Sequence, residues 1–381
     1  MQELLPLAVS SPSVAVSVLA LLVSVAYLLH KASLLSQNSD TQLLSRKKGS
    51  GKDEARPSAA AKTIQSTVSK ESDFPGNWWT GKDIFDLERR AIFSKTWLYV
   101  SHRSRFTKPG DYHSFQLAGF PIFLILGKDG IVRAFHNVCR HRAYTITRKE
   151  SGSTTVLGCR YHGWSYNTRG QLINAPHFQN VPGFDKSQNG LFEIHTRTTQ
   201  HGLIFINLDA NPTVPEVDST YTDVFASRQG LLLNSTWVAG WTLEGAFNWK
   251  LADNSFDMHV LQDHVPRSTL ASVFSLLTDK SAKRGPSSLS LFPTASLHTI
   301  PATGLWYSLC FFPSSESRTL IRCDLYSSRP TIDATSKLVS EKLVEILRER
   351  IKNVENDFKS HYQESGYVYE DLAKRPLSIY K

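Results

Sequence analysis

The first thirty residues are almost without charge. From Val14 to Leu29 the chain is mostly apolar, and the uncharged stretch extends back to Leu4. A bilayer core needs ~20 such residues, so we predict a membrane anchor over 1–31. A cleaved signal peptide is the alternative, but it requires positive charge before the apolar run, whereas here the positive charges follow it from Lys31 onward. This order places the rest of the chain in the cytosol, and we expect the anchor in the endoplasmic reticulum, with an organellar targeting segment left open.

Residues 32–72 are rich in Ser, Lys, Gln and Ala, and their apolar positions follow no period. We therefore predict a flexible linker. Much of the chain's net charge of +9 lies between Lys31 and Lys70. No basic helix with interleaved aromatic residues accompanies it, so nucleic-acid binding is not predicted, and a solvated tether beside the membrane explains the charge.

Beyond residue 72 the hydrophobic pattern changes several times. A short helix is predicted within 74–95, followed over 97–178 by short alternating runs that glycines interrupt, as in small antiparallel β domains. Within them, GKDG at 127–130 predicts a hairpin turn. A broken helical segment is predicted over 241–264, with strand-like runs on either side of it. From Thr335 to about Gln363 apolar residues recur at helical spacing, which predicts a long amphipathic helix.

The order of these elements predicts an α+β fold. After the transmembrane helix we expect an antiparallel β domain over 73–185. A helix-grip-like antiparallel sheet with a long C-terminal helix then forms a second domain over 186–381. The length of 381 residues and the hydrophobic content of 41% suit a globular enzyme.

The chain has four cysteines, too few for a secreted domain of this size that depends on disulfides. Cys310 and Cys323 lie in strand-like runs, and we expect both in the core. The other two lie in the segments NVCRHRAY and GCRYHGWSY. They form Cys139-x-His141, seventeen intervening residues, and Cys159-x-x-His162.

Two thiolates and two imidazoles from paired loops are the ligands of a Rieske [2Fe-2S] cluster, in which one iron takes the Cys pair and the other the His pair. A Cys₂His₂ zinc site is the alternative, but zinc fingers place both Cys before both His. The glycine before Cys159 and the HGW after it also resemble Rieske loops. One departure is Arg160, which stands where the family usually has Pro, and it removes no ligand.

A second candidate metal site lies in FNWKLADNSFDMHVLQDHVPR, where four residues separate His259 from His264. Two His and one carboxylate form the facial triad of non-heme Fe(II) oxygenases. An isolated pair of this spacing is weak evidence. The order NWK, Asp253-Asn254, Asp257 and the two His, downstream of the Rieske motif, resembles the catalytic segment of Rieske oxygenase α-subunits. The resemblance covers roughly residues 75–365 and is nearest to the choline monooxygenase-like branch.

The resemblance implies further site residues. A carboxylate usually lies three residues before the first His and links it to a Rieske His of the neighbouring subunit. Here Phe256 stands at that place and Asp257 follows, so Asp257 is predicted to bridge the centres, with Asp253 as the alternative. The third iron ligand is expected on the C-terminal helix, where Asp357 matches by residue type and Glu355 by its spacing to Gln363. We predict Asp357.

This family resemblance implies an oxygenase with a Rieske cluster and a mononuclear Fe(II), assembled as a homotrimer. The chain has no GxGxxG fingerprint and no plant-type ferredoxin motif. A separate NAD(P)H-dependent reductase or ferredoxin must therefore supply the electrons. The expected outcome is hydroxylation of a small-molecule substrate, or a dealkylation or desaturation.

Two other functions are left open. A choline or quaternary-ammonium oxygenase needs an aromatic cage. Aromatic residues available for one are Trp241, Trp306, Tyr307, Phe311 and Phe312, although such spacings are more often core. A membrane-bound Rieske electron carrier without catalytic iron is the other alternative. The predicted anchor favours a lipophilic, specialised metabolite over a quaternary-ammonium cation, while the unusual spacing of Asp257 and His259 keeps the electron carrier open.

Overall fold

The computed structural model describes residues 75–178, 180–252, 256, 286–330 and 332–363. The predicted anchor over 1–31 and linker over 32–72 lie outside them. Every described element lies within Glu71–Lys381. Among the described helices, none is both long enough and apolar enough to cross a membrane.

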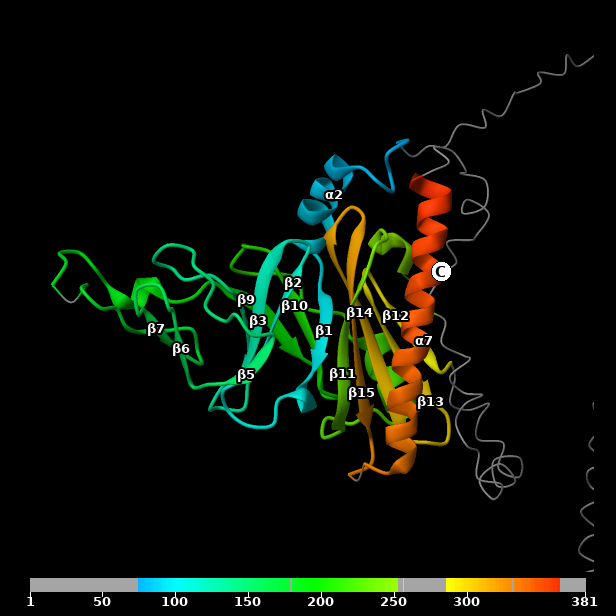
Figure 1. Cartoon of the computed structure of the whole chain (residues 1–381). Coiled ribbons are helices and arrows are strands. Elements are labelled where there is room, and N and C mark those ends of the chain that lie inside the picture. Colours follow the sequence, from blue (N-terminus) through cyan, green and yellow to red (C-terminus); the bar gives the residue numbers. More distant parts are fainter. Residues whose placement is uncertain (1–74, 179, 253–255, 257–285, 331, 364–381) are drawn as a thin grey trace, which may run out of the picture. The chain divides into compact units, whose positions relative to one another are not determined.

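An antiparallel sheet of seven strands forms the first half of the described chain (Figure 1). Its spatial order is β1-β10-β9-β4-β3-β2-β5. The strands are β1 (Leu98–His102), β2 (Asp111–Leu117), β3 (Phe120–Leu126), β4 (Val132–His136), β5 (Ser151–Ser153), β9 (Glu193–Thr198) and β10 (Leu203–Asn207). The turn between β3 and β4 is GKDG, as predicted for a hairpin, and Gly130 takes the positive φ of 78° that this turn requires.

A smaller sheet of three strands carries the metal-binding segment. It consists of β6 (Val156–Gly158), β7 (Ser165–Asn167) and β8 (Leu172–Asn174). Strands β9 and β10 follow residue 185 in the chain, yet they pair with β4 and β1 in the seven-stranded sheet. The first sheet therefore takes strands from both sides of the predicted boundary.

The second half of the described chain is a five-stranded antiparallel sheet with one long helix along it (Figure 1). Its order is β11-β15-β14-β13-β12. The strands are β11 (Thr236–Gly245), β12 (Ser288–Leu291), β13 (Ala295–Ile300), β14 (Leu305–Ser315) and β15 (Arg318–Ser327). The broken helix predicted from Trp241 is wrong at its start, because Trp241 to Gly245 pair with β15 as a strand.

Strand β14 is buried on both faces, and its side chains alternate between two cores. Tyr307, Leu309 and Phe311 pack in the core that contains the C-terminal helix. Trp306 and Phe312 pack with residues of the seven-stranded sheet instead. The sheet therefore binds the helix on one face and the first sheet on the other.

The long C-terminal helix is confirmed. Helix α7 (Ala334–Phe358) continues through the π-helical turn η5 (Lys359–Gln363), which is the predicted span. Asp333 caps it by accepting a hydrogen bond from the backbone N–H of Ser336 at 2.8 Å. The α+β class with antiparallel sheets is likewise confirmed. The remaining short helices are α2 (Lys82–Glu88), η1 (Arg89–Phe93), η2 (Arg103–Arg105), η3 (Lys186–Asn189), α3 (Thr220–Gln229) and η4 (Trp249–Leu251).

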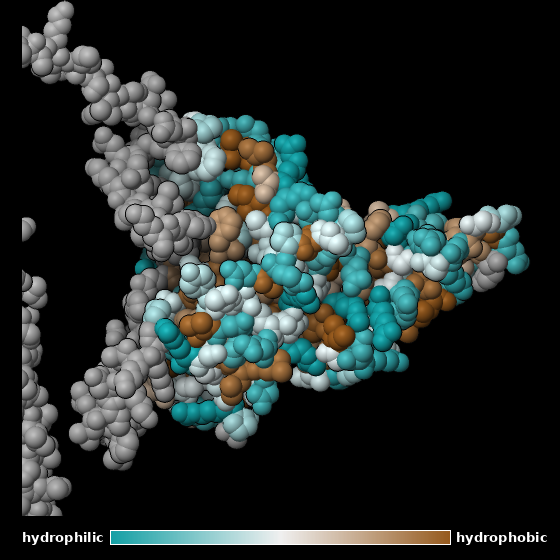
Figure 2. All heavy atoms as spheres, turned by 180° about the vertical axis from the view of Figure 1, so that it is seen from behind, coloured by the Kyte–Doolittle hydropathy of each residue, from teal (hydrophilic) through white to brown (hydrophobic). Residues whose placement is uncertain are grey.

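The two remaining cysteines are buried, as predicted, and lie on opposite faces of the five-stranded sheet. Cys310 packs in the core with the first sheet, and Cys323 packs in the core with α7. Figure 2 shows that apolar residues on the face turned away in Figure 1 lie in small groups between polar ones.

Candidate metal centres

Two loops present the four predicted ligands of the first centre, and their backbones share one hydrogen-bond pattern. In the loop after β4, the N–H of Cys139 donates to the carbonyl of Tyr144 at 2.8 Å, and the N–H of Ala143 donates to the carbonyl of Cys139 at 2.9 Å. The loop between β6 and β7 repeats this. Cys159 donates to Trp164 at 2.7 Å, and Gly163 donates to Cys159 at 3.0 Å. Each cysteine therefore sits at the start of the same kind of turn.

The turns need left-handed backbone at the residue four after each cysteine. Ala143 has φ of 52° and Gly163 has φ of 74°. At Gly163 a Cβ would lie 3.2 Å from Cγ of Pro176, which is tight, so glycine is favoured there by space as well as by conformation. The HGW sequence is explained by this turn.

The four side chains gather between the loops. Both thiols are buried, with 2% exposure at Cys139 and 3% at Cys159. The rings of His141 and His162 lie 4.6 Å apart between centroids. The Nδ1 atoms of both rings are buried without a hydrogen-bond partner among the described residues. A buried ring nitrogen in this state is costly unless it binds something, so this donor set fits a cluster held by Cys139, Cys159, His141 and His162.

No three His, Cys, Asp or Glu side chains within the described ranges converge on one point that suits a single metal ion. A [2Fe-2S] cluster takes only two protein ligands per iron, so its ligands need not form a group of this kind.

Neighbouring side chains shape the electrostatics of this centre. The hydroxyl of Tyr166 lies 3.3 Å from Sγ of Cys139 and accepts from the N–H of Arg140 at 3.2 Å. Trp164 stacks on His141 with centroids 5.0 Å apart. Burial raises the pKa of the Cys139 thiol, while burial and the charge of His162 lower the pKa of His141. Sequence reasoning missed Tyr166, although this residue lies only four positions after His162 in the segment GCRYHGWSY.

The predicted residues of the second centre are only partly described. Asp253, Asp257, His259 and His264 lie outside the described residues. Phe256, where the family usually places the bridging carboxylate, is 3% exposed and packs against Phe311 with centroids 4.9 Å apart.

The NWK motif just before this segment is held firmly. Asn248 donates to the carbonyl of Trp79 at 3.0 Å. Nζ of Lys250 lies 2.6 Å from Oε1 of Glu88, a buried residue of α2, and Nε1 of Trp249 donates to the other carboxylate oxygen at 2.8 Å. The Lys250 ammonium also lies within 6 Å of three indole rings, those of Trp78, Trp79 and Trp249. This cation–π box joins the start of the described chain to the residues that precede the predicted iron ligands.

The two candidates for the third iron ligand differ in their surroundings. Asp357 is exposed on α7. Glu355 is half-buried, and its Oε1 accepts from the backbone N–H of Ala246 at 2.8 Å, between β11 and the NWK motif. Asp357 stays a prediction, and Glu355 is the candidate that faces the segment leading to His259.

Comparisons with known proteins bear on both centres. Residues 96–185 match the Rieske [2Fe-2S] domain family. The carnitine monooxygenase oxygenase subunit of Acinetobacter baumannii is 25% identical over 336 residues, which cover 80% of this chain and 90% of that protein. The chlorobenzene dioxygenase α-subunit of a Cupriavidus species is 32% identical over 185 residues, covering 47% of this chain and 40% of that one.

The Rieske match and the oxygenase relatives together support the Rieske non-heme iron oxygenase α-subunit family for this chain. As an oxygenase α-subunit it is an oxidoreductase with a Rieske cluster and a mononuclear iron. Among solved structures, a quaternary ammonium Rieske monooxygenase with L-carnitine bound has the same fold, with a TM-score of 0.61 and 23% identity over 77% of this chain and 86% of that one. Naphthalene 1,2-dioxygenase with indole bound follows at a TM-score of 0.53 and 16% identity, over 75% of this chain and 79% of that one.

A buried polar network joins the two halves of this oxygenase. We call the seven-stranded and three-stranded sheets the Rieske domain, and the five-stranded sheet with α7 the catalytic domain. Arg322 of β15 donates to Oδ2 of Asp324 at 2.9 Å and to Nδ1 of His113 on β2 at 2.8 Å. Oδ1 of Asp324 accepts from Arg105 and from Trp237, both at 2.9 Å. Sequence reasoning missed this network.

The charges of the network balance around one imidazole. Arg105 and Arg322 oppose Asp324 and Glu150, whose Oε1 lies 3.4 Å from Nε2 of His113. Burial, followed by the charge of Arg322, lowers the pKa of His113 to about 3, so this ring is neutral. The signal in the sequence was the pair of opposite charges two residues apart in an apolar strand, because such positions share one face.

Proposed function

We propose that this oxygenase uses O₂ and externally supplied electrons to hydroxylate a lipophilic small molecule, or to dealkylate or desaturate it. The observation that carries the proposal is the face of the catalytic sheet that packs with α7. Its apolar and aromatic cluster contains none of the buried charged residues of the described chain, although the polar Thr319 is buried beside it. A charged substrate against such a wall would lose its hydration without gaining a partner.

Each predicted ligand has a role in this proposal. Cys139, Cys159, His141 and His162 hold the Rieske cluster. His259, His264 and Asp357 hold the mononuclear iron, and Asp257 bridges toward the cluster of a neighbouring subunit. When bound, the two centres store electrons and activate O₂. The chain itself orients the ligands, excludes water and positions the substrate.

A second candidate is a quaternary-ammonium substrate, which the carnitine monooxygenase relatives favour because they align over 90% of their length. The five aromatic residues considered for a cage do not support it as one group. Trp306 and Phe312 pack toward the Rieske domain, while Tyr307, Phe311 and Trp241 pack toward α7. Of the two sets, only Tyr307, Phe311 and Trp241 lie on the face of the sheet where Phe256 packs.

We further propose a homotrimer that takes electrons from a separate NAD(P)H-dependent reductase or ferredoxin. One solved relative is described by its inter-subunit electron transfer. We also propose that residues 1–31 anchor the chain in the endoplasmic reticulum membrane with the described domains in the cytosol. Fractionation of cell membranes, with protease protection of the body, tests this topology. A chain released from membranes by salt alone would contradict it.

The first experiment measures iron, acid-labile sulfide and the EPR spectrum of the full-length chain after anaerobic reconstitution. Three irons and two sulfides per chain with a Rieske-type signal are expected. O₂ uptake is then compared across matched lipophilic and quaternary-ammonium compounds. Uptake only with the cations would favour the second candidate. Two irons, unchanged by His259→Ala, would mean that the chain is an electron carrier, and the oxygenase proposal would fail.

A further inference from the structure

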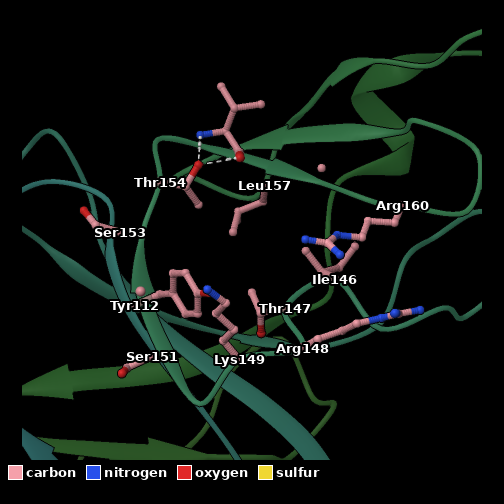
Figure 3. Close-up of a pocket in the computed structure, with 13 residues that line it drawn as sticks. Tyr112, Ile146, Thr147, Arg148, Lys149, Ser151, Ser153, Thr154, Leu157 and Arg160 are labelled. Atoms are coloured by element: carbon pink, nitrogen blue, oxygen red, sulfur yellow. Dashed lines mark hydrogen bonds between the residues drawn. The ribbon is translucent and has the colours of Figure 1, made fainter.

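An open cavity of about 350 Å³ lies beside the Rieske loops (Figure 3). Strand β2 contributes Tyr112 to its lining, and the segment after the first loop contributes Arg148 and Lys149. Gly158 and Arg160, which flank the ligand Cys159, complete it on the other side. We call this cavity the basic cleft. It therefore reaches a residue directly bonded to a cluster ligand.

The basic cleft has an uncompensated positive charge. Arg148, Lys149 and Arg160 are exposed, and no Asp or Glu is among the residues that line the cavity. Within the described part of the chain, no carboxylate forms an ion pair with any of the three. The nearest acid in sequence, Glu150, is held 3.4 Å from His113 and accepts from Thr242.

Lys149 and Arg160 differ from Arg140, the arginine that supports the loop, whereas Arg148 also lies over a ring, 5.1 Å from the centroid of Tyr144. Arg140 donates to the carbonyl of Gly190 at 3.0 Å and lies over the ring of Phe192 at 3.9 Å from its centroid. The guanidinium of Arg140 therefore makes its contacts within the folded chain. In the basic cleft, Figure 3 shows Arg160 reaching in from one side, with Lys149 and Tyr112 on the other. Apolar Ile146 and Leu157 lie between them. Both are buried, with 7% and 2% exposure, so the surface that the cleft offers a partner is formed by the cations and by exposed residues such as Val156.

We propose that the basic cleft docks an acidic electron-donor protein of the ferredoxin type. This inference rests on the proposed function, which requires such a donor. Electron-transfer complexes are small and transient, and opposite charges steer their formation. One electron leaves the reduced donor, which is oxidised, and enters the cluster held by Cys139, His141, Cys159 and His162, which is reduced. No atom is transferred. Because the cleft adjoins Cys159, a donor seated there has a short path for the electron.

Arg160 gives this chain a cation where the Rieske loops of the family usually have Pro. Arg160, Arg148 and Lys149 thus place three positive charges around the basic cleft, from two separate segments of the chain. Binding through such a surface weakens as salt screens it, with a Debye length of ~10 Å at 0.1 M. The proposal therefore predicts both a residue dependence and a salt dependence.

The test uses the full-length reconstituted chain and an acidic plant-type ferredoxin as the probe. Binding of the oxidised ferredoxin is titrated, and reduction of the cluster by reduced ferredoxin is followed by stopped flow. Arg148→Glu, Lys149→Glu and Arg160→Glu are each expected to weaken binding and slow reduction about tenfold, as is high salt for the unmodified chain. Lys352→Glu, an exposed charge reversal on α7, is the matched control and is expected to change neither.

Reduction by methyl viologen radical, a small cation, is measured in parallel, together with the midpoint potential of each variant. Ferredoxin binding that is equal in all variants, or independent of salt, would overturn the proposal. So would a loss of viologen reduction equal to the loss with ferredoxin, because the cluster itself would then be altered. If inorganic phosphate binds the cleft and ferredoxin does not, the cleft is a small-anion site and the proposal also fails. Salt-dependent ferredoxin binding with no O₂ uptake for any substrate would instead refute only the proposed function.

Discussion

Arg322 donates a hydrogen bond from Nη1 to Nδ1 of His113, at 2.8 Å, across the junction of the Rieske and catalytic domains. Both side chains are buried, with 3% and 2% exposure. Since a guanidinium only donates, Nδ1 must accept, and the ring proton therefore sits on Nε2, which faces Glu150. The bond thus sets the tautomer of His113 and links the catalytic sheet to the strand beside the first Rieske loop.

Removal of Arg322 should destabilise the chain strongly. In Arg322→Met, Asp324 keeps Arg105 but loses its second buried cation, and His113 loses its donor. Breaking a buried pair on one side costs about 3 kcal/mol. Arg318→Ala is the control, because Arg318 lies on the same strand in an exposed pair with Glu244, and such pairs contribute about 0–1 kcal/mol. Chemical denaturation measures both, and similar losses would contradict the role given to the network.

The neutral state of His113 should make stability depend on pH. Its pKa is about 3 in the folded chain and 6.5 when unfolded. Between these values the unfolded chain binds a proton that the folded chain does not, so stability falls as pH falls from 6.5 toward 3. The pKa of Glu150 is lowered to about 2 from 4.5, so its contribution is lost only below pH 4.5.

The comparison that isolates this effect is His113→Gln, which keeps an acceptor for Arg322 and a donor for Glu150. Between pH 6.5 and 4.5 the unmodified chain should lose more stability than the variant, measured by denaturation at each pH. Parallel curves for the two chains in this window would show that His113 does not carry the dependence.

The hydroxyl of Tyr166 should raise the reduction potential of the cluster. It lies 3.3 Å from Sγ of Cys139, and a hydrogen bond to a cluster sulfur favours the more negative, reduced state. Tyr166→Phe removes about 1 kcal/mol, which lowers the potential of a one-electron couple by on the order of 40 mV. Redox titration followed by EPR measures it. Tyr112→Phe, on β2, is the control, and an equal shift there would argue against the hydrogen bond.

The third iron ligand can be identified by metal content. We predict that Asp357→Ala lowers the iron from three to two per chain and leaves the two sulfides unchanged, as for His259→Ala. Glu355→Ala should keep three irons and lose only the bond to the N–H of Ala246. The reverse outcome would make Glu355 the ligand, in agreement with its half-buried position.

The Lys250–Glu88 pair should stabilise the entry to the catalytic segment. Lys250→Met leaves the buried Glu88 carboxylate with only the Trp249 N–H and is expected to cost about 3 kcal/mol. The double variant with Glu88→Gln keeps an acceptor for Trp249 without a charge, and we expect it to regain about 2 kcal/mol. Denaturation followed by tryptophan fluorescence measures this recovery. A double variant less stable than Lys250→Met would refute the pairing.

The sequence alone determined the local features of this protein. The spacing of Cys139, His141, Cys159 and His162 specified one loop pair and one chemistry, because both turns are short and their hydrogen bonds are local. The long helix α7 could be predicted because apolar residues recur at helical spacing along its 25 residues. The hairpin at Gly130 followed from its turn chemistry.

Only the tertiary structure decided what distant segments do together. β9 and β10 join the first sheet through pairing with β4 and β1, which no local pattern encodes. Trp241 lies in a strand because β15 offers it partners, and tertiary pairing overrides local propensity. The contacts of Arg322 with His113 and of Lys250 with Glu88 span 209 and 162 residues of chain. Such pairs form only when folding removes both polar groups from water at one place, and a linear pattern does not record which groups will meet.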